Sequence, residues 1–285
     1  LKQHAARVYY AGDDDQCIHR WNGVEVSHFM NACDSHRVLD QSYRVPKQVF
    51  TLANQIVKRI HYRQPKLWKP MDREGEIHWH SNWYDVDIDE GSWTIMGRTN
   101  LIASKIANQL REDGHLFKMY DKLSFSEELI HAMAIWKRLT EDQAISIEEA
   151  RSLYKQVPKQ GPRAVVKRGS IKSFDTVDPQ SVFKYADLRR DHGLLAAKTA
   201  DAKDVCNVSK DDRLYLSAII RRGSFKPRLT VSTIHRMKGG EDDNIMLLTE
   251  SCYPAVKNPE QDDEHRVFYT GITRTKHNLH IVDPE

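Results

Sequence analysis

Three features are scarce or absent in this sequence of 285 residues. No apolar run approaches the roughly 20 residues that a membrane-spanning helix needs, so we expect no membrane span. The first residue is Leu1 rather than Met, and no basic start followed by an apolar stretch marks a signal peptide. We therefore expect a soluble, cytoplasmic piece of a longer protein.

Cysteine is also scarce. The four cysteines are widely spaced and include no C-x-x-C pair: Cys17, Cys33, Cys206 and Cys252. This spacing argues against a disulfide framework or a structural zinc site, and it is typical of a reducing cytosol. Histidine is more abundant, but the pair His78 and His80 has no carboxylate or cysteine at ligand spacing. We expect no metal site.

The net charge is only +3, which is too weak to indicate a nucleic-acid partner. The basic residues are unevenly distributed, however. Residues 151–172 contain seven basic side chains and no acidic one: Arg151, Lys155, Lys159, Arg163, Lys167, Arg168 and Lys172. This stretch is either a solvated, flexible face or a surface that contacts phosphates, with Lys167 and Arg168 as candidate residues.

The spacing of the apolar residues predicts alternating strands and helices. The predicted strands are residues 7–11, 76–80, 93–97, 229–234, 244–248 and 278–282. One predicted helix follows Pro46. The other predicted helices cover residues 101–113, 129–139, 150–157 and 265–275. Strand–helix alternation at both ends, around a mostly helical middle, predicts an α/β sheet domain that carries an insertion.

Polar residues predict where some helices begin. Asn100 can cap the helix over residues 101–113. The pairs Ser124 with Glu127 and Ser146 with Glu149 have the spacing of capping boxes, each ahead of a predicted helix in the insertion.

The segment from Gly12 to Gly23, GDDDQCIHRWNG, follows the first predicted strand. Its glycines and aspartates are typical of a polar turn. The three adjacent carboxylates at 13–15 are a weaker candidate for a divalent-cation site, because adjacent side chains seldom face one point. Trp21 is unusual in so polar a segment, and beside Arg20 it can stack on an unpaired base.

Four further segments carry polar side chains near the ends of predicted elements. They are residues 39–44 (LDQSYR), 94–100 (TIMGRTN), 231–241 (VSTIHRMKGGE) and 263–276 (DEHRVFYTGITRTK). A strand that ends in a polar, glycine-containing turn is a common place for ligand contact in α/β sheets. In the last segment, helical spacing of the apolar residues leaves Arg274 near the end of the helix.

In this order, the five segments resemble motifs III, IV, IVa, V and VI of superfamily 1A (UvrD/Rep-type) DNA helicases. The resemblance assigns nucleotide contacts to Gln16, Tyr43, Arg44, Gly239, Glu241 and Arg274. It implies that Gln16 and Arg44 reach the γ-phosphate of ATP and that Arg274 is the arginine finger. Tyr43 would lie near the adenine, and the other two near the ribose and phosphates.

The same resemblance assigns DNA contacts to His19, Trp21, Arg98, Asn100, Thr233 and His235. Trp21 would stack on single-stranded bases, and Thr233 and His235 would touch the backbone. Arg98 and Asn100 have either a structural role or a place near a DNA phosphate. The sequence departs from the family pattern at three positions, with His19 for Tyr, Ser42 for Asn and Gly240 for Leu.

The resemblance implies a RecA-like fold with defined boundaries. Residues 1–37 would end the first motor domain, residues 38–115 and 228–285 would form the second, 2A-like motor domain, and residues 116–227 would form a mostly helical 2B-like insertion. The sequence has no Gly-Lys-Ser/Thr triplet, so it lacks the loop that binds ATP phosphates. We expect this loop and the main Mg²⁺ ligands upstream of Leu1, and no ATPase activity from the chain alone.

The intact protein is then expected to be an ATP-dependent 3′–5′ DNA helicase that uses ATP and Mg²⁺. The expected partners are single-stranded DNA, single-strand/double-strand junctions and the missing N-terminal motor domain, with the protein acting as a monomer. Two alternatives are a non-catalytic DNA-binding or scaffold module derived from a helicase, and the helicase part of a helicase–nuclease. The presence of both Arg44 and Arg274 argues against the non-catalytic module.

Overall fold

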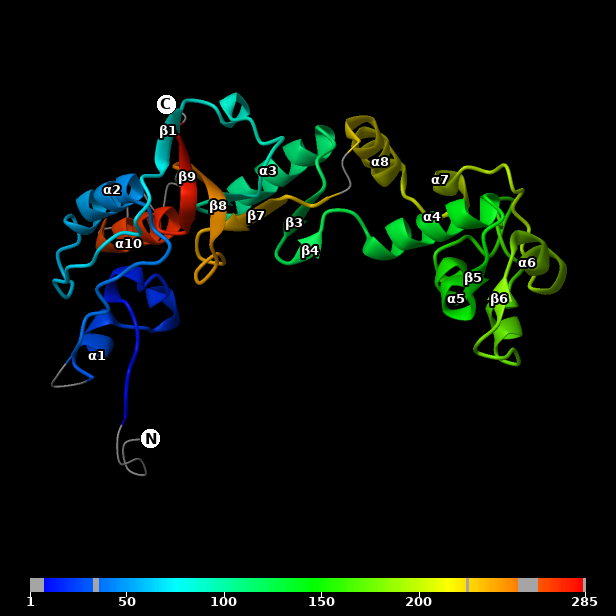
Figure 1. Cartoon of the computed structure of the whole chain (residues 1–285), viewed down its shortest axis with the longest axis horizontal. Helices are drawn as coiled ribbons and strands as arrows, with labels where there is room; N and C mark the ends of the chain where they lie inside the picture. The colour runs from blue at the N-terminus through cyan, green and yellow to red at the C-terminus, as the bar shows by residue number, and fades with distance from the viewer. Residues whose placement is uncertain (1–7, 33–35, 224–225, 251–260, 284–285) are drawn as a thin grey trace. The chain divides into compact units, whose positions relative to one another are not determined.

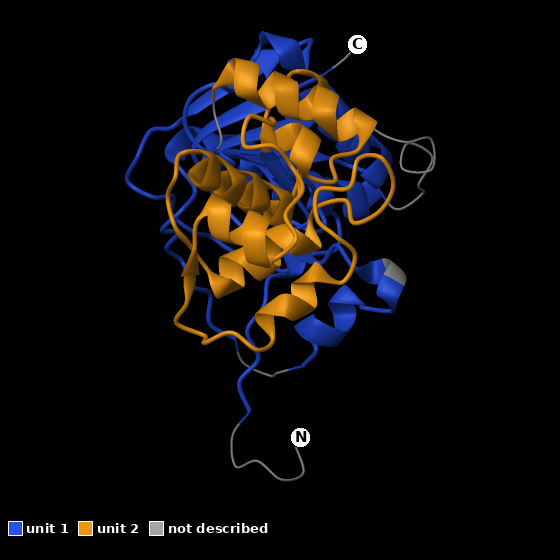
Figure 2. Cartoon of the chain, turned by 90° about the vertical axis from the view of Figure 1, so that its right-hand side faces the viewer, with its two compact units in different colours: residues 1–110, 117–122, 226–285 blue, residues 111–116, 123–225 orange. Residues whose placement is uncertain are grey.

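The computed structural model of the chain describes residues 8–32, 36–223, 226–250 and 261–283, without the side chain of Trp21 (Figure 1). The chain forms two compact units (Figure 2). Unit 1 comprises residues 1–110, 117–122 and 226–285, and unit 2 comprises residues 111–116 and 123–225. Among the described residues, no helix has both the length and the apolar character needed to cross a membrane.

Seven strands of the described residues form one sheet in the order β1-β9-β8-β2-β7-β3-β4. They are β1 (Glu76–His80), β2 (Trp93–Gly97), β3 (Phe117–Met119), β4 (Lys122–Leu123), β7 (Leu229–Thr233), β8 (Asp242–Leu248) and β9 (Thr275–Val282). Every pairing from β1 across to β3 is parallel. The predicted α/β class, with a mostly parallel central sheet, is therefore confirmed.

Successive residues of a strand point to opposite faces of the sheet, and apolar residues on both faces pack against helices. The helices are α2 (Lys47–Val57), α3 (Asn100–Glu112) and α10 (Gln261–Ile272). α3 packs with Ile95 on one face, whereas α2 and α10 pack with Met96 on the other. All five residues of β2 are buried, as is typical of a parallel strand covered on both sides.

The segment ahead of the sheet differs from its prediction. Its described helices are short: η1 (Asp14–Gln16), η2 (Arg20–Asn22) and α1 (Val26–Met30). The strand predicted over residues 7–11 is wrong for its described part, since residues 8–11 form no strand and Tyr9 is 85% exposed. A strand needs a neighbour to take up its backbone hydrogen bonds, and none of the described strands pairs with this segment.

Thr99 determines the start of α3. Its Oγ1 accepts a hydrogen bond from the amide of Ile102 at 3.3 Å. The prediction that Asn100 caps this helix is wrong, because Asn100 is already the first helical residue. Its side chain instead accepts a hydrogen bond from the Tyr120 hydroxyl at 2.7 Å.

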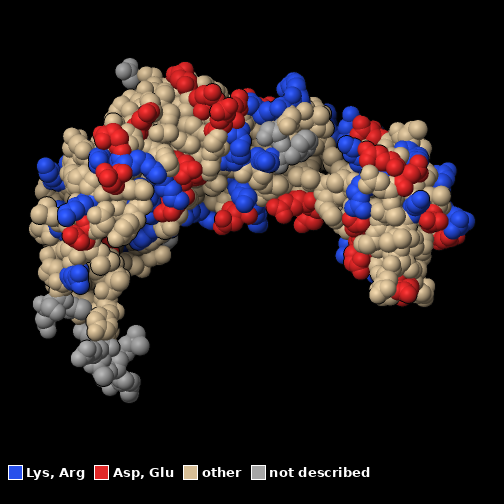
Figure 3. All heavy atoms as spheres, viewed as in Figure 1, with Lys and Arg blue, Asp and Glu red and all other residues tan. Residues whose placement is uncertain are grey.

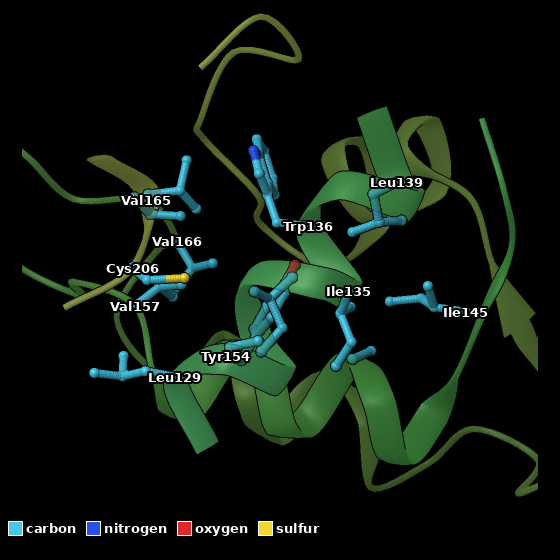
Figure 4. Close-up of a cluster of buried hydrophobic side chains, with 14 of the residues drawn as sticks. Leu129, Ile135, Trp136, Leu139, Ile145, Tyr154, Val157, Val165, Val166 and Cys206 are labelled. Carbon is cyan, nitrogen blue, oxygen red and sulfur yellow. The ribbon is translucent and has the colours of Figure 1, made fainter. Parts of the chain in front are cut away.

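Unit 2 is mostly helical. Its elements are α4 (Glu127–Thr140), β5 (Ile145–Ser146), α5 (Ile147–Lys155), η4 (Ser170–Phe174), β6 (Val182–Phe183), α6 (Tyr185–Asp191), α7 (Ala202–Val205) and α8 (Lys210–Arg222). Trp136 and Tyr154 lie in its core (Figure 4), and their polar groups are bonded although buried. The Trp136 indole donates to the Ala200 carbonyl at 2.8 Å, and the Tyr154 hydroxyl donates to the His192 carbonyl at 3.1 Å.

One of the two predicted capping boxes of unit 2 is present. Ser146 and Glu149 form it at the start of α5, which confirms the prediction. The box predicted for Ser124 and Glu127 is wrong, because Ser126 caps α4. An N-cap must directly precede the first helical residue, and Ser126 is the serine that does.

Candidate functional site

Arg274 lies between α10 and β9 and is 2% exposed. Its Nε donates to the Thr270 carbonyl at 2.9 Å. Its terminal nitrogens donate to the Gly240 carbonyl at 3.3 Å and to Gln16 Oε1 at 2.5 Å. Burial, and after it the positive charge of Arg44, lowers the pKa of Arg274 to about 10. The end of α10 thus holds a buried guanidinium against segments that are far apart in the sequence.

Gln16, at the end of η1, uses both ends of its amide. The oxygen accepts from Arg274, and Nε2 donates to Asp13 Oδ2 at 2.6 Å. Asp13 also caps η1, where its carboxylate accepts from the Asp15 amide at 3.2 Å. The glutamine therefore connects the buried guanidinium to the first turn of η1.

The three adjacent carboxylates do face one point, contrary to the sequence-based expectation. Their ligand oxygens lie within 4.8 Å of one another. That point is taken by the ammonium of Lys66, which lies 2.8 Å from Asp13 and 2.9 Å from Asp15 and also contacts Asp14. Arg63 completes the cluster with two hydrogen bonds of 2.8 Å to Asp15. The cluster is an internal ion-pair network.

Arg44 and Lys276 approach one carboxylate from two sides. Arg44 lies 3.4 Å from one oxygen of Glu241, and Lys276 lies 2.8 Å from the other. The hydrogen bond from Lys276, more than that from Arg44, lowers the pKa of Glu241. The Arg44 Nε is buried and has no hydrogen-bond partner among the described residues. The backbone here is held by Ser42, whose hydroxyl accepts from the amides of Arg44 and Val45 at 3.3 and 3.1 Å.

Tyr43 and Gly239 lie on the surface of unit 1. The Tyr43 side chain is 86% exposed. Gly239 has a φ of +90°, a backbone conformation that L side chains rarely adopt. It lies in the turn that leads to Gly240, whose carbonyl accepts from Arg274. Of the residues predicted to contact the nucleotide, Gln16, Arg44, Glu241 and Arg274 thus form one connected cluster, and the other two lie on adjoining surface turns.

The residues predicted to contact DNA gather around His235, just beyond β7. Its ring centroid lies 5.9 Å from that of His19. Burial, followed by the charge of Arg98, lowers the pKa of His235 to about 4, so the imidazole is neutral near pH 7. Arg98 makes two hydrogen bonds to Glu264, at 2.9 and 2.7 Å. Thr233 is buried, and its hydroxyl accepts from the amide at position 236 at 3.4 Å.

Three other predicted DNA contacts are distributed differently. The backbone of Trp21 lies in η2, and its side chain is outside the described part of the chain. Lys167 and Arg168 belong to unit 2, where both are exposed. The Lys167 amide donates to the Gly193 carbonyl at 2.9 Å, which holds the backbone of this basic loop.

A cleft of about 540 Å³ lies beside η2 in unit 1. Its lining includes Arg20, Val26, Tyr62, Asp262 and Arg266. The side chain of Asp262 accepts hydrogen bonds from the amides of residues 61 and 62, which fixes this wall against α10. The cleft offers both charged and aromatic surface next to the predicted base-stacking segment.

Sequence reasoning missed several residues of these clusters. Lys66 and Arg63 neutralise the three aspartates, and Lys276 shares Glu241 with Arg44. Nothing in the local pattern around Lys66 marks it, because its partners lie about fifty positions away. Lys276 was the easier to find, since it falls within the motif VI segment.

Parts of this chain are similar to known proteins. Residues 197–283, which include β7, α10 and Arg274, match the UvrD-like helicase C-terminal domain. The chain is 20% identical to the ATP-dependent DNA helicase PcrA of Staphylococcus aureus strain Mu50, over 95% of this chain and 50% of that protein. Residues 197–283 thus resemble a UvrD-like helicase C-terminal domain, and the chain is similar to PcrA-type helicases.

Other relatives match shorter stretches of this chain. The chain is 26% identical to PcrA of Bacillus subtilis strain 168, over 46% of the chain and 18% of that protein. It is 29% identical to PcrA of Leuconostoc citreum, over 41% of the chain and 15% of that protein. The chain thus spans at most about half the length of these curated relatives.

Proposed function

We propose that this chain supplies the second motor domain of an ATP-dependent DNA helicase that moves 3′ to 5′ along single-stranded DNA and unwinds duplex. The observation that carries the proposal is the meeting of Gln16, Arg44 and Arg274. They come from three distant segments, yet Arg274 donates a hydrogen bond to Gln16 at 2.5 Å, and the positive charge of Arg44 contributes to the lowered pKa of Arg274. The likeness to PcrA, a DNA helicase by name, supports the same activity.

The chemistry of this cluster fits an anionic ligand. Arg44 and Lys276 share a single carboxylate, Glu241, and the Arg44 Nε has no partner among the described residues. The nearby Arg274 guanidinium donates to the neutral oxygens of Thr270, Gly240 and Gln16. A polyphosphate would supply acceptors for these donors. Arg274, as the arginine finger, would stabilise charge on the transferring phosphoryl group, and Gln16 would sense the γ-phosphate.

The surface turns next to the cluster would complete the nucleotide site. Tyr43 would lie against the adenine, and Gly239 with Glu241 would approach the ribose and phosphates. Mg²⁺ would be held by residues of the first motor domain, since the three adjacent aspartates, Asp13 to Asp15, already surround the ammonium of Lys66. In our proposal that domain is a partner supplied by the rest of the protein, which acts as a monomer.

DNA would bind at the carboxyl ends of the parallel strands, where ligands usually contact α/β sheets. Thr233 and His235 would touch the backbone, Trp21 would stack on bases, and His19 would support it. Arg98 and Asn100 would lie near a phosphate, although Arg98 is engaged with Glu264.

Unit 2 would correspond to the 2B-like insertion over residues 116–227. Residues 38–115 and 228–285 would be the 2A-like motor domain, and residues 1–37 the end of the first. Lys167 and Arg168 would contact the duplex ahead of the motor. On the face seen in Figure 3, basic and acidic side chains intermingle.

The proposal predicts the behaviour of the purified chain and of the longer protein. The 285-residue chain should show negligible DNA-stimulated ATP hydrolysis, because its sequence has no phosphate-binding loop. Robust hydrolysis by this chain would contradict us. In a protein that also contains the first motor domain, Arg274→Lys should slow hydrolysis about 10³–10⁵-fold, because lysine cannot reproduce the guanidinium fork. Arg228→Lys, at the far end of β7, is the matched control and should leave the rate unchanged.

A further inference from the structure

A strained hairpin lies at the same end of the sheet as the proposed DNA contacts. Tyr120 and Asp121 join β3 to β4, and their φ angles are +53° and +64°. Two-residue hairpin loops with both φ angles positive strongly favour Asn, Asp and Gly. A bulky aromatic residue with positive φ is a genuine outlier, and such strain is kept where the surroundings require that side chain.

The side chain of Tyr120 joins three segments of unit 1. Its hydroxyl donates to Asn100 Oδ1 at 2.7 Å, and the Arg236 Cζ lies 4.2 Å from the centre of its ring. Asn100 follows β2, Tyr120 follows β3 and Arg236 follows β7. Because β2, β7 and β3 are neighbouring parallel strands, their carboxyl ends meet at one edge of the sheet. Tyr120 is thus fixed at this edge by both of its neighbours.

Arg236 is held by the ring but not neutralised. Its side chain is exposed, and no carboxylate of the described residues forms an ion pair with it. A guanidinium over the face of an aromatic ring can still offer its N–H groups to a ligand, in a fork that matches a phosphate. Arg236 directly follows His235 and lies three positions after Thr233, the two residues proposed to touch the DNA backbone.

We propose that Arg236, laid on Tyr120, binds one phosphate of a single-stranded nucleic acid, and that Tyr120 is its positioning residue. This inference rests on the proposed function and adds to it a contact that the motif resemblance did not assign. The strain of Tyr120 is then explained, because glycine at this position would relax the turn but leave Arg236 without its platform.

Salt-dependent binding tests the proposal. The 285-residue chain is titrated against a fluorescein-labelled oligothymidylate, and anisotropy gives the dissociation constant over a salt series. Arg236→Gln should weaken binding about tenfold. It should also reduce the slope of log K against log salt by about 0.7, the value for one phosphate contact on a single strand. Arg228→Gln removes the same charge at the other end of β7 and should leave the slope unchanged.

Two further variants separate positioning from folding. Tyr120→Gly should weaken binding nearly as much as Arg236→Gln, while its thermal midpoint stays equal to or above that of the wild type. The double variant should bind no more weakly than Arg236→Gln alone, because each single change already removes the same phosphate contact. A Tyr120→Gly chain that loses stability and affinity together would show a purely structural tyrosine and overturn its positioning role.

The outcomes also separate this inference from the proposed function. If the wild type binds and Arg236→Gln binds with the same affinity and salt slope, the phosphate contact alone is overturned. No salt-dependent binding by the wild type would overturn the DNA role of this chain, and the phosphate contact with it.

Discussion

Removal of the Lys66 charge is the sharpest test of the ion-pair network in unit 1. Lys66→Met keeps most of the aliphatic stem but removes the ammonium that three carboxylates share. Asp14 and Asp15 are only 4% and 1% exposed, so water cannot replace it. Removing one partner from a buried ion pair typically costs about 3–5 kcal/mol. Because Arg63 still pairs with Asp15, we expect a loss near the lower limit, about 3 kcal/mol.

The loss should depend on pH in a defined direction. Burial alone would raise the pKa of Asp15, but hydrogen bonds from Arg63 and Lys66 outweigh burial and lower it. A carboxyl whose folded pKa is lowered stabilises the fold above its unfolded pKa and loses that contribution as the solution is acidified. Without Lys66, burial and the neighbouring carboxylates would raise the pKa of Asp15. Acid would then lower the free energy of unfolding of the wild type but remove the repulsion between carboxylates in the variant. The difference between their free energies of unfolding should therefore shrink.

Urea unfolding followed by circular dichroism measures this difference at about pH 7 and about pH 4.5. Lys47→Met is the matched control, because Lys47 lies 2.7 Å from Asp72 in a pair that is exposed, and it should unfold like the wild type. Millimolar Ca²⁺ should stabilise Lys66→Met but not the wild type, since three carboxylate ligands then face an empty point. Equal urea midpoints at neutral pH, or a difference that persists in acid, would refute this reasoning.

Two other predictions concern the core of unit 2 and His280 in β9 of the sheet. Trp136→Phe should destabilise unit 2 by about 1–3 kcal/mol, because the Ala200 carbonyl loses its 2.8 Å hydrogen bond; an unchanged urea midpoint would contradict this. Burial, followed by the charges of His78 and His80, lowers the pKa of His280 to about 4, so the unfolded chain takes up the proton at higher pH than the folded one. Stability should therefore fall as the pH drops from 6.5 towards 4, and His280→Gln should lose less over this range. Equal slopes of midpoint against pH in the two proteins would count against that role for His280.

Much of the fold was predictable from local pattern. The buried run of β2, the helical spacing of α2 and the capping box of Ser146 and Glu149 each depend on neighbours in the sequence, and each is present. The motif segments also singled out Gln16, Arg44 and Arg274, because residue type and order in the chain suffice for such a resemblance. Whether these residues lie close together is a separate question, which only the fold answers.

The errors share one physical cause. Several nearby groups could form the same hydrogen bonds, and the sequence pattern does not show which of them does. Thr99 rather than Asn100 caps α3, and Ser126 rather than Ser124 caps α4, because backbone geometry selects which of two nearby side chains can reach the free amides. The described part of the strand predicted over residues 7–11, residues 8–11, forms no strand for a related reason, since apolar composition predicts a strand but cannot supply its neighbour.

By itself, the sequence determined the α/β class, the order of the main elements and the resemblance to a helicase family, because these depend on periodicity and on short motifs. Only the tertiary structure decided what the charged residues do. The sequence pattern makes the three adjacent aspartates a weak candidate for a cation site, but the fold brings Lys66 from about fifty positions away to pair with them. The same long-range folding lays Arg236 on Tyr120, since the carboxyl ends of parallel strands meet however far apart they are in the chain.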